Sequence, residues 1–448
     1  MRTLISNPTI VNEGEKFRGS IIVSNGKIVE VLRGSKLPRI ACDEVIDASG
    51  LYLIPGVIDD HVHFREPGLT AKATIATESK AAAAGGVTSY MEMPNTIPQT
   101  TTLKALKEKY AIAAKESLIN YSFYFGATNR NMKDFAKLNR KRICGIKLFM
   151  GSSTGNMLVE KQEELERIFS EAARLNMPIA VHCEDSGIIS ENARHIKEEH
   201  GDNPGVEYHP VIRSAEACYQ STRSAIELAK KYGTRLNVMH ISTARELELL
   251  ESHPLGEKRI TAEATPSHLT FCSKDYARLG TKIKCNPAIK EESDRDALRA
   301  AINDGRIDVI GTDHAPHLPK DKEGGALKAA SGMPSIQFSL LAMLRLADEG
   351  ILTIETIVEK MCHNPARIYG IDRRGFIKRG DFADFVLLNP KKTHTIKKSK
   401  IISKCGWSPF EGEKYKWRVE QTWVNGECVY NNGKINNEVR GKAIKFSR

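Results

Sequence analysis

The sequence lacks several features that would place it in common classes of protein. It has no apolar run near the roughly 18 to 20 residues that a membrane helix requires, and no signal-peptide core follows Met1 and Arg2. Its nine cysteines form no Cys-x-x-Cys pair, which argues against a disulfide framework and against a zinc ribbon. We therefore expect a cytoplasmic protein with reduced thiols.

The basic charge of the chain does not indicate a nucleic-acid partner. The formal net charge is +11, but the lysines and arginines are spread along the chain. The one dense cluster, between Lys391 and Lys404, lacks the interleaved aromatic residues that stack on bases. A solvated basic surface explains the charge better. We expect a small-molecule substrate, no nucleic-acid or membrane partner, and assembly into a homo-oligomer, most simply a dimer.

Both ends of the chain have the pattern of β structure. Residues 19–31 and 422–430 each place two apolar runs around an Asn-Gly pair, which is the strongest short hairpin signal, and 385–388 reads as another strand. We predict that residues 1–54 and 372–448 come together as one small composite β-sandwich domain. The alternative is two unrelated caps.

The middle of the chain, residues 55–371, alternates short apolar runs with longer amphipathic stretches, as parallel βα units do. Eight candidate strands lie at 57–59, 87–93, 121–125, 145–149, 178–182, 236–240, 260–264 and 309–313. Their number and spacing predict an α/β fold, a closed (β/α)8 barrel of the TIM type. A doubly wound open sheet is the alternative, but no Gly-rich dinucleotide motif follows any of these strands.

Ligand-type side chains gather at the ends of the predicted strands, where such a barrel builds its active site. His61 and His63 lie two residues apart on one strand, so both point the same way and can meet one metal ion. The other strands carry or end in Asn95, Lys147, His182, His240 and Asp313. Any one histidine could be an ordinary core residue, but the repetition at six of eight strand ends favours a metal site.

Four imidazoles and a carboxylate suit zinc, which cobalt, manganese or nickel could replace. One ion would not use so many ligands and keep a position open for water, so we expect two ions. An anion between them could come from Lys147, if carbon dioxide converts its amine into a carbamate. An ordinary lysine at a strand end is the alternative. Arg65, one step beyond His63, offers a planar cation for a substrate carboxylate.

In these residues the chain resembles the dihydroorotases, which form part of the cyclic-amidase branch of the metal-dependent amidohydrolase superfamily. The resemblance extends over most of the chain and keeps the order of the motifs. The matching segments are 59–68, 84–88, 93–96, 146–149, 181–184, 240–244, 261–266, 311–317 and 408–412.

The resemblance implies reversible cyclisation of N-carbamoyl-L-aspartate to (S)-dihydroorotate and water in de novo pyrimidine (UMP) biosynthesis. It implies two zinc ions per subunit, bridged by carboxylated Lys147 and a hydroxide, with Asp313 as general acid and base. One ion would be held by His61, His63, Lys147 and Asp313, and the other by Lys147, His182 and His240. Substrate contacts would come from Arg65, Asn95, Asn286 and His317.

Two positions depart from the family pattern. Some dihydroorotases replace the carboxylated lysine by an aspartate on the loop after the fourth strand, but here no acid occurs from Gly151 to Val159, which favours the carbamate. This loop, residues 151–158, could close over a substrate or be an ordinary connection. Ser267 stands where relatives often have a bulkier residue, and its effect on the substrate stays open.

The alternatives are a hydantoinase or dihydropyrimidinase, an allantoinase, and a scaffold protein without catalytic activity. The three enzymes act on rings that lack the carboxylate of dihydroorotate. Arg65 and Asn95 disfavour them, because a buried guanidinium without an anion is costly. The complete set of metal ligands disfavours the scaffold.

Overall fold

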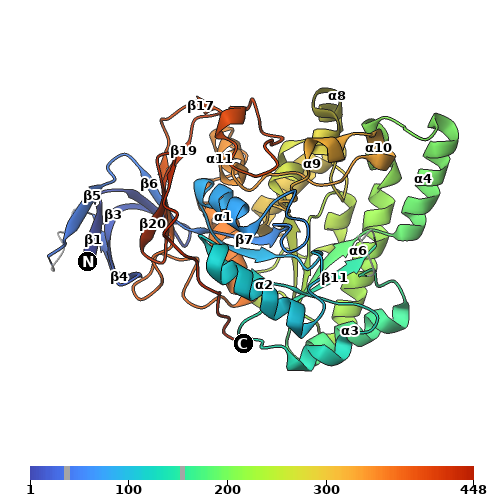
Figure 1. Cartoon of the computed structure of the whole chain (residues 1–448), viewed down its shortest axis with the longest axis horizontal. Helices are drawn as coiled ribbons and strands as arrows, with labels where there is room; N and C mark the ends of the chain where they lie inside the picture. Colours follow the sequence, from blue (N-terminus) through green and yellow to red (C-terminus); the bar gives the residue numbers. More distant parts are fainter. Residues whose placement is uncertain (35–40, 152–156) are drawn as a thin grey trace.

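The computed structural model describes residues 1–34, 41–151 and 157–448 and shows a barrel joined to a β-rich part (Figure 1). The barrel strands pair in parallel throughout. They are β7 (Val57–Val62), β8 (Val87–Glu92), β9 (Asn120–Phe123), β10 (Phe125–Gly126), β11 (Ile146–Met150), β12 (Ile179–Cys183), β13 (Leu236–Val238), β14 (Ile260–Ala264) and β15 (Val309–Ile310).

The strands close into a ring. Strands β7 to β9 form one ladder and β10 to β15 another, and only Tyr124 separates β9 from β10. A parallel bridge between Val62 and His314 joins the first strand to the segment after the last one. All eight predicted strands are present, and the predicted barrel is confirmed.

Two predicted strands end earlier than expected. The strand predicted over 236–240 stops at Val238, and the one predicted over 309–313 stops at Ile310. His240 and Asp313 have φ angles of 41° and 48°, which lie in the left-handed region and cannot continue a strand. The chain therefore bends at the points where it presents these two side chains.

Helices follow the barrel strands and lie around the outside of the barrel (Figure 1). The longer ones are α1 (Ile75–Ala84), α2 (Leu103–Glu116), α3 (Gln162–Arg174), α4 (Ser186–His200), α6 (Ala215–Tyr232), α9 (Glu292–Asp304) and α11 (Ser339–Asp348). The short ones are α5 (His209–Ile212), α7 (Pro266–Thr270), α8 (Tyr276–Leu279), α10 (Gly325–Lys328), α12 (Ile354–Val358) and α13 (Asn364–Tyr369).

Strands from both ends of the chain come together, as predicted, and form one ten-stranded sheet. Their order is β21-β20-β19-β16-β6-β2-β3-β1-β5, with β4 also paired to β3. The strands are β1 (Arg2–Ser6), β2 (Thr9–Asn12), β3 (Glu15–Ser24), β4 (Lys27–Arg33), β5 (Glu44–Asp47), β6 (Tyr52–Pro55), β16 (Phe385–Asn389), β19 (Arg418–Val424), β20 (Glu427–Asn431) and β21 (Lys434–Ile435). Phe385 and Trp423 stack in its separate core, with ring centroids 5.2 Å apart.

The two predicted hairpin turns pack against each other. Asn25, Gly26, Asn425 and Gly426 all have positive φ angles, as this type of turn requires. A Cβ atom on Gly26 would lie 2.8 Å from the carbonyl oxygen of Asn425, so the contact needs glycine. The Asn-Gly pairs thus shape the turns and also join the two ends of the chain.

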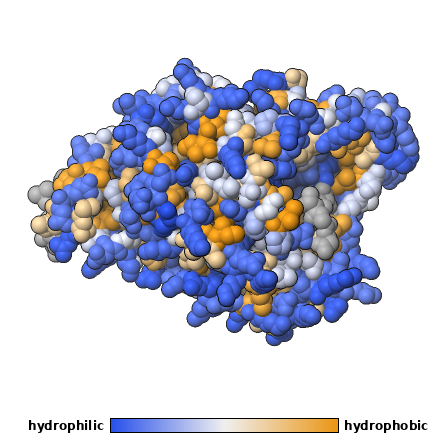
Figure 2. All heavy atoms as spheres, viewed as in Figure 1, coloured by the Kyte–Doolittle hydropathy of each residue, from blue (hydrophilic) through white to orange (hydrophobic). Residues whose placement is uncertain are grey.

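The surface in view is largely hydrophilic, with hydrophobic residues in scattered groups (Figure 2). Among the described residues no helix is long and apolar enough to cross a membrane. All nine cysteines are free thiols. Residues 152–156 of the predicted loop lie outside the described residues, and the domain boundaries after residues 54 and 371 stay predictions.

Candidate active site

Three potential metal ligands converge where the barrel closes. The Nε2 atoms of His61 and His63 lie 3.2 and 3.0 Å from Oδ1 of Asp313. The ligand atoms of the three residues all lie within 4.8 Å of one another. The histidines come from the end of β7 and Asp313 from the segment after β15, which closure of the barrel makes neighbours. Two imidazoles and a carboxylate in this arrangement could hold a divalent ion.

Two further side chains orient these imidazoles. His61 Nδ1 lies 2.9 Å from Oε1 of Glu263, and His63 Nδ1 lies 2.7 Å from Oδ1 of Asn95. Because both oxygens are acceptors, each Nδ1 carries the proton and each Nε2 presents a lone pair to Asp313. Burial lowers the pKa of His61 to about 3 and that of His63 to about 4, so both rings are neutral near pH 7. Lone pairs that face a carboxylate need a cation between them.

A second pair of imidazoles has the same character. His182 lies on β12 and His240 follows β13. Nδ1 of His182 lies 2.9 Å from Nε2 of His240. His182 Nε2 lies 2.8 Å from Oε2 of Glu184, which also pairs with Arg213. Burial acts to raise the pKa of Glu184, but Arg213 and His182 outweigh it and hold the pKa at about 2. Glu184 therefore accepts the Nε2 proton, and the lone pair on His182 Nδ1 faces His240.

The two pairs of histidines are adjacent, and Lys147 lies beside both. The ring centroids of His61 and His240 are 5.3 Å apart. Lys147 is 1% exposed, and its Nζ lies 3.1 Å from Sδ of Met239. Burial lowers the pKa of Lys147 to about 8, against the attraction of Glu263 and Asp313. A substantial part of this amine is therefore neutral at slightly basic pH, which is the form that reacts with carbon dioxide.

Arg65 stands on the other side of Asp313 without an acidic partner. Its side chain is buried, its Nε donates to the Pro316 carbonyl at 3.1 Å, and its Nη2 lies 3.0 Å from Nε2 of His317. Within residues 1–34, 41–151 and 157–448 no carboxylate forms an ion pair with it. Burial lowers its pKa to about 10, so the group stays charged at neutral pH. A buried guanidinium in this state favours an anionic ligand.

The other two predicted substrate contacts differ from each other. Asn95 uses its Oδ1 to hold His63, and its Nδ2 is available as a donor to a substrate. The Oδ1 atom of Asn286 is buried without a hydrogen-bond partner in the described part of the chain, and no hydrogen bond there joins it to Arg65 or His317. The structure therefore brings Arg65, Asn95 and His317 together near His61, His63 and Asp313. Asn286 does not join them, and its Oδ1 is free to accept a hydrogen bond.

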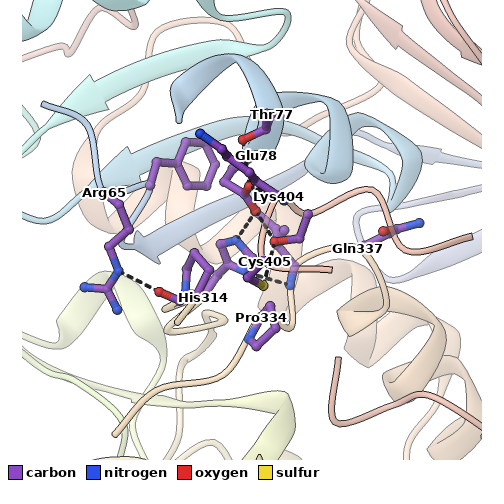
Figure 3. Close-up of polar contacts among 12 residues, drawn as sticks. Arg65, Thr77, Glu78, His314, Pro334, Gln337, Lys404 and Cys405 are labelled. Carbon is purple, nitrogen blue, oxygen red and sulfur yellow. Dashed lines mark hydrogen bonds and ion pairs between the residues drawn. The ribbon is translucent and has the colours of Figure 1, made fainter. Parts of the chain in front are cut away.

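Figure 3 shows a cluster beside Arg65 that includes Glu78 and His314 and holds the segment after β15. Glu78, on α1, lies with Oε2 2.8 Å from Nε2 of His314 and 2.6 Å from the Ser403 hydroxyl. The backbone N–H of Lys404 donates to Glu78, and that of Ser335 donates to His314 Nδ1.

Three site residues have strained backbone conformations: Arg65, His240 and Asp313 have φ angles of 70°, 41° and 48°. Backbone strain at three site residues persists only where such surrounding contacts hold it in place.

The sequence reasoning gave no role to the acids that orient the ligands. Glu78, Glu184 and Glu263 are each fully buried against an imidazole. The available signal was a single glutamate within or beside an apolar run, as in Ile260–Ala264. Such a residue indicates a buried partner without naming it, because the partner lies far away in the sequence.

Comparisons with known proteins identify the family of the chain. The model of the amidohydrolase family matches residues 52–429. A protein from Methanosphaera stadtmanae named dihydroorotase is 34% identical over 397 residues, which cover 88% of this chain and 89% of the relative. A protein from Bacillus velezensis named allantoinase is 30% identical, over 96% of this chain and 94% of the relative. The solved structure of L-hydantoinase (dihydropyrimidinase) from Arthrobacter aurescens is 28% identical, with a TM-score of 0.92 over 97% of both chains.

Proposed function

The chain belongs to the amidohydrolase family, and we propose that within this family it acts as a dihydroorotase. The reaction is the reversible cyclisation of N-carbamoyl-L-aspartate to (S)-dihydroorotate and water, a step of de novo pyrimidine synthesis. Relatives from several organisms bear the name dihydroorotase at 30 to 34% identity over most of the chain. These similarities support the choice of reaction.

The observation that carries the proposal is the buried guanidinium of Arg65, which forms no ion pair with a carboxylate among the described residues and lies next to the ligand group of His61, His63 and Asp313. Dihydroorotate keeps one carboxylate throughout the reaction, and Arg65 with His317 offers it a cation and a hydrogen-bonding ring. Hydantoin and allantoin rings lack this carboxylate, so with them the charge of Arg65 would stay unpaired. This supports dihydroorotate over the rings of the other cyclic amidases.

The donor set fits two zinc ions. His61, His63 and Asp313 would hold one ion, because two imidazole lone pairs face a carboxylate there, and His182 and His240, whose ring nitrogens lie 2.9 Å apart, would hold the other. A carboxylated Lys147 would lie between them. Zinc at these positions supplies Lewis acidity and lowers the pKa of water. Carboxylation needs no further reagent: the neutral Nζ amine adds to carbon dioxide and releases one proton.

Asp313 is the proton carrier in this proposal. In hydrolysis its carboxylate accepts a proton from the attacking water and returns it to the ring nitrogen that leaves. In synthesis the ureido nitrogen attacks the side-chain carboxyl carbon, and Asp313 accepts the proton that this nitrogen loses and gives it to the departing hydroxyl, which leaves as water. Burial acts to raise the pKa of Asp313, but in the acid range, where His61 and His63 are protonated, their charges outweigh it and keep the pKa below its ordinary value. The residue is therefore ionised before water attacks.

One experiment tests the proposal. The purified protein is analysed for metal and assayed with dihydroorotate, hydantoin and allantoin. We expect zinc at about two ions per chain and turnover of dihydroorotate well above that of the other two rings. Turnover of hydantoin or allantoin alone would replace the proposal by the corresponding activity. The proposal also includes a cytoplasmic location and a dimeric state. Size-exclusion chromatography with light scattering measures the oligomeric state.

A further inference from the structure

Lys72 lies in the loop before α1 and shares one imidazole with Arg65. Its Nζ lies 3.0 Å from Nδ1 of His317, while Nη2 of Arg65 lies 3.0 Å from Nε2 of the same ring. The two cations therefore stand on opposite edges of a single side chain that is 9% exposed. None of the sequence motifs pointed to Lys72 as part of the site.

The hydrogen-bond balance of this group is incomplete. Arg65 and Lys72 are donors only, and both positive charges lower the pKa of His317, in addition to burial, so the ring is neutral. A neutral imidazole accepts at one nitrogen and donates at the other. One of the two contacts therefore sets a donor against a donor. A ligand with two acceptor oxygens would resolve this conflict.

The charge balance points the same way. Among the described residues, the one carboxylate that forms an ion pair with Lys72 or His317 is Asp321, whose Oδ2 lies 3.4 Å from Lys72 Nζ and 3.9 Å from His317 Nδ1. Asp321 also accepts from the backbone N–H of Leu318 at 3.1 Å, which fixes it to its own turn. Arg65 and Lys72 thus carry one positive charge more than Asp321 neutralises. The Lys72 side chain is 26% exposed, so a solute can reach it.

We propose that Lys72 is a specificity-determining residue that binds the carboxylate retained by the substrate, together with Arg65 and His317. This inference rests on the proposed dihydroorotase function and names a further anchor for its substrate. The ligand class is a small ring or open-chain ureido compound with a carboxylate next to the reacting amide. A substrate carboxylate that accepts from Arg65 would gain a second charge-assisted hydrogen bond when the Lys72 side chain turns from His317 toward it, which also relieves the repulsion between the two cations.

The test compares Lys72→Met and Lys72→Gln with wild type in both reaction directions. Loss of one charge-assisted hydrogen bond should raise KM about 10- to 100-fold, while kcat changes less than about threefold, because the carboxylate takes no part in bond breaking. Lys72→Arg should stay within a few-fold of wild-type KM. Zinc content should not change. Lys274→Met, which removes an exposed lysine paired to Glu292 at 2.6 Å, is the matched control and should behave as wild type.

Asp321→Asn separates binding from a structural role. If Lys72 served only to hold the turn of Asp321, this variant would raise KM as much as Lys72→Met does. The proposal expects no rise, because Lys72 would be freed for the substrate. It is overturned if Lys72→Met and Lys72→Gln both keep KM within about twofold, or if Asp321→Asn reproduces their effect. Wild-type protein without turnover of dihydroorotate would instead overturn the proposed function.

Discussion

The carboxylate of Glu78 and the imidazole of His314 meet in the interior at 2.8 Å, although 236 residues separate them. His314 follows the proposed proton carrier Asp313, and its carbonyl accepts from the backbone N–H of His63 at 2.8 Å. Burial acts to raise the pKa of Glu78, but contacts with His314, Ser403 and Lys404 lower it overall. Glu78 is therefore an ionised acceptor that fixes the segment after β15 (Figure 3).

Glu78→Gln should impair catalysis through Asp313. Glutamine keeps the shape but loses the charge that holds His314 Nε2–H, and changes at residues that orient a metal site cost about 10- to 100-fold in activity or metal affinity. Steady-state kinetics and zinc analysis measure the effect. Ser403→Ala removes a single hydrogen bond to Glu78 and should cost about 1 kcal/mol of stability with a smaller loss of activity. Wild-type kcat in Glu78→Gln would contradict a positioning role.

Arg65→Ala should lose substrate affinity while keeping zinc. The guanidinium faces His317 and the Pro316 carbonyl, and its loss removes the main charge for the substrate carboxylate. Removing one partner of a buried charged pair costs about 2 to 5 kcal/mol, which corresponds to a fall in kcat/KM of about 30-fold to several thousand-fold. Assays with dihydroorotate and metal analysis measure both effects. Full activity of this variant would refute the assignment of the substrate.

Lys147→Ala should be inactive and partly rescued by short carboxylic acids. The acid would fill the space of the deleted side chain and supply the carboxylate that the carbamate provides in the wild type. Activity is measured against acetate or propionate concentration, with chloride at equal ionic strength as the control. The carbamate is excluded if Lys147→Ala is fully active without any added acid.

Lys109→Met should destabilise the barrel strongly. Lys109 Nζ lies 3.0 Å from Oε2 of Glu92, and both side chains are fully buried. Loss of the lysine leaves an unpaired buried carboxylate, which costs about 3 to 5 kcal/mol in the free energy of unfolding. Denaturant unfolding measures the change.

The matched control is Lys104→Met, on the same helix. Its exposed pair with Glu108 spans 4.0 Å, and its loss should cost less than about 0.5 kcal/mol. Adding Glu92→Gln to Lys109→Met should restore part of the stability, because the unpaired charge disappears. Equal losses in Lys109→Met and Lys104→Met would show that the buried pair has no special weight.

Much of this architecture could be predicted from local patterns. The Asn-Gly turns at Asn25 and Asn425 are short-range signals, since few residues adopt the required positive φ angles. Alternation of strand and helix patterns predicted all eight barrel strands. The two-residue spacing of His61 and His63 predicted that both imidazoles point the same way, and they meet Asp313 at the end of β7. The two strand ends at His240 and Asp313 were predicted too long, because a left-handed turn at these residues leaves no local pattern.

The sequence by itself therefore determined the kinds of element, their order and the ligand-type residues at the strand ends, since periodicity and turn chemistry act over a few residues. Only the tertiary structure decided which side chains meet. Closure of the barrel brings Asp313 to His61, and Glu263 to the opposite edge of the same ring. It also sets Lys72 and Arg65 on either side of His317, and such long-range contacts depend on packing that no local pattern records.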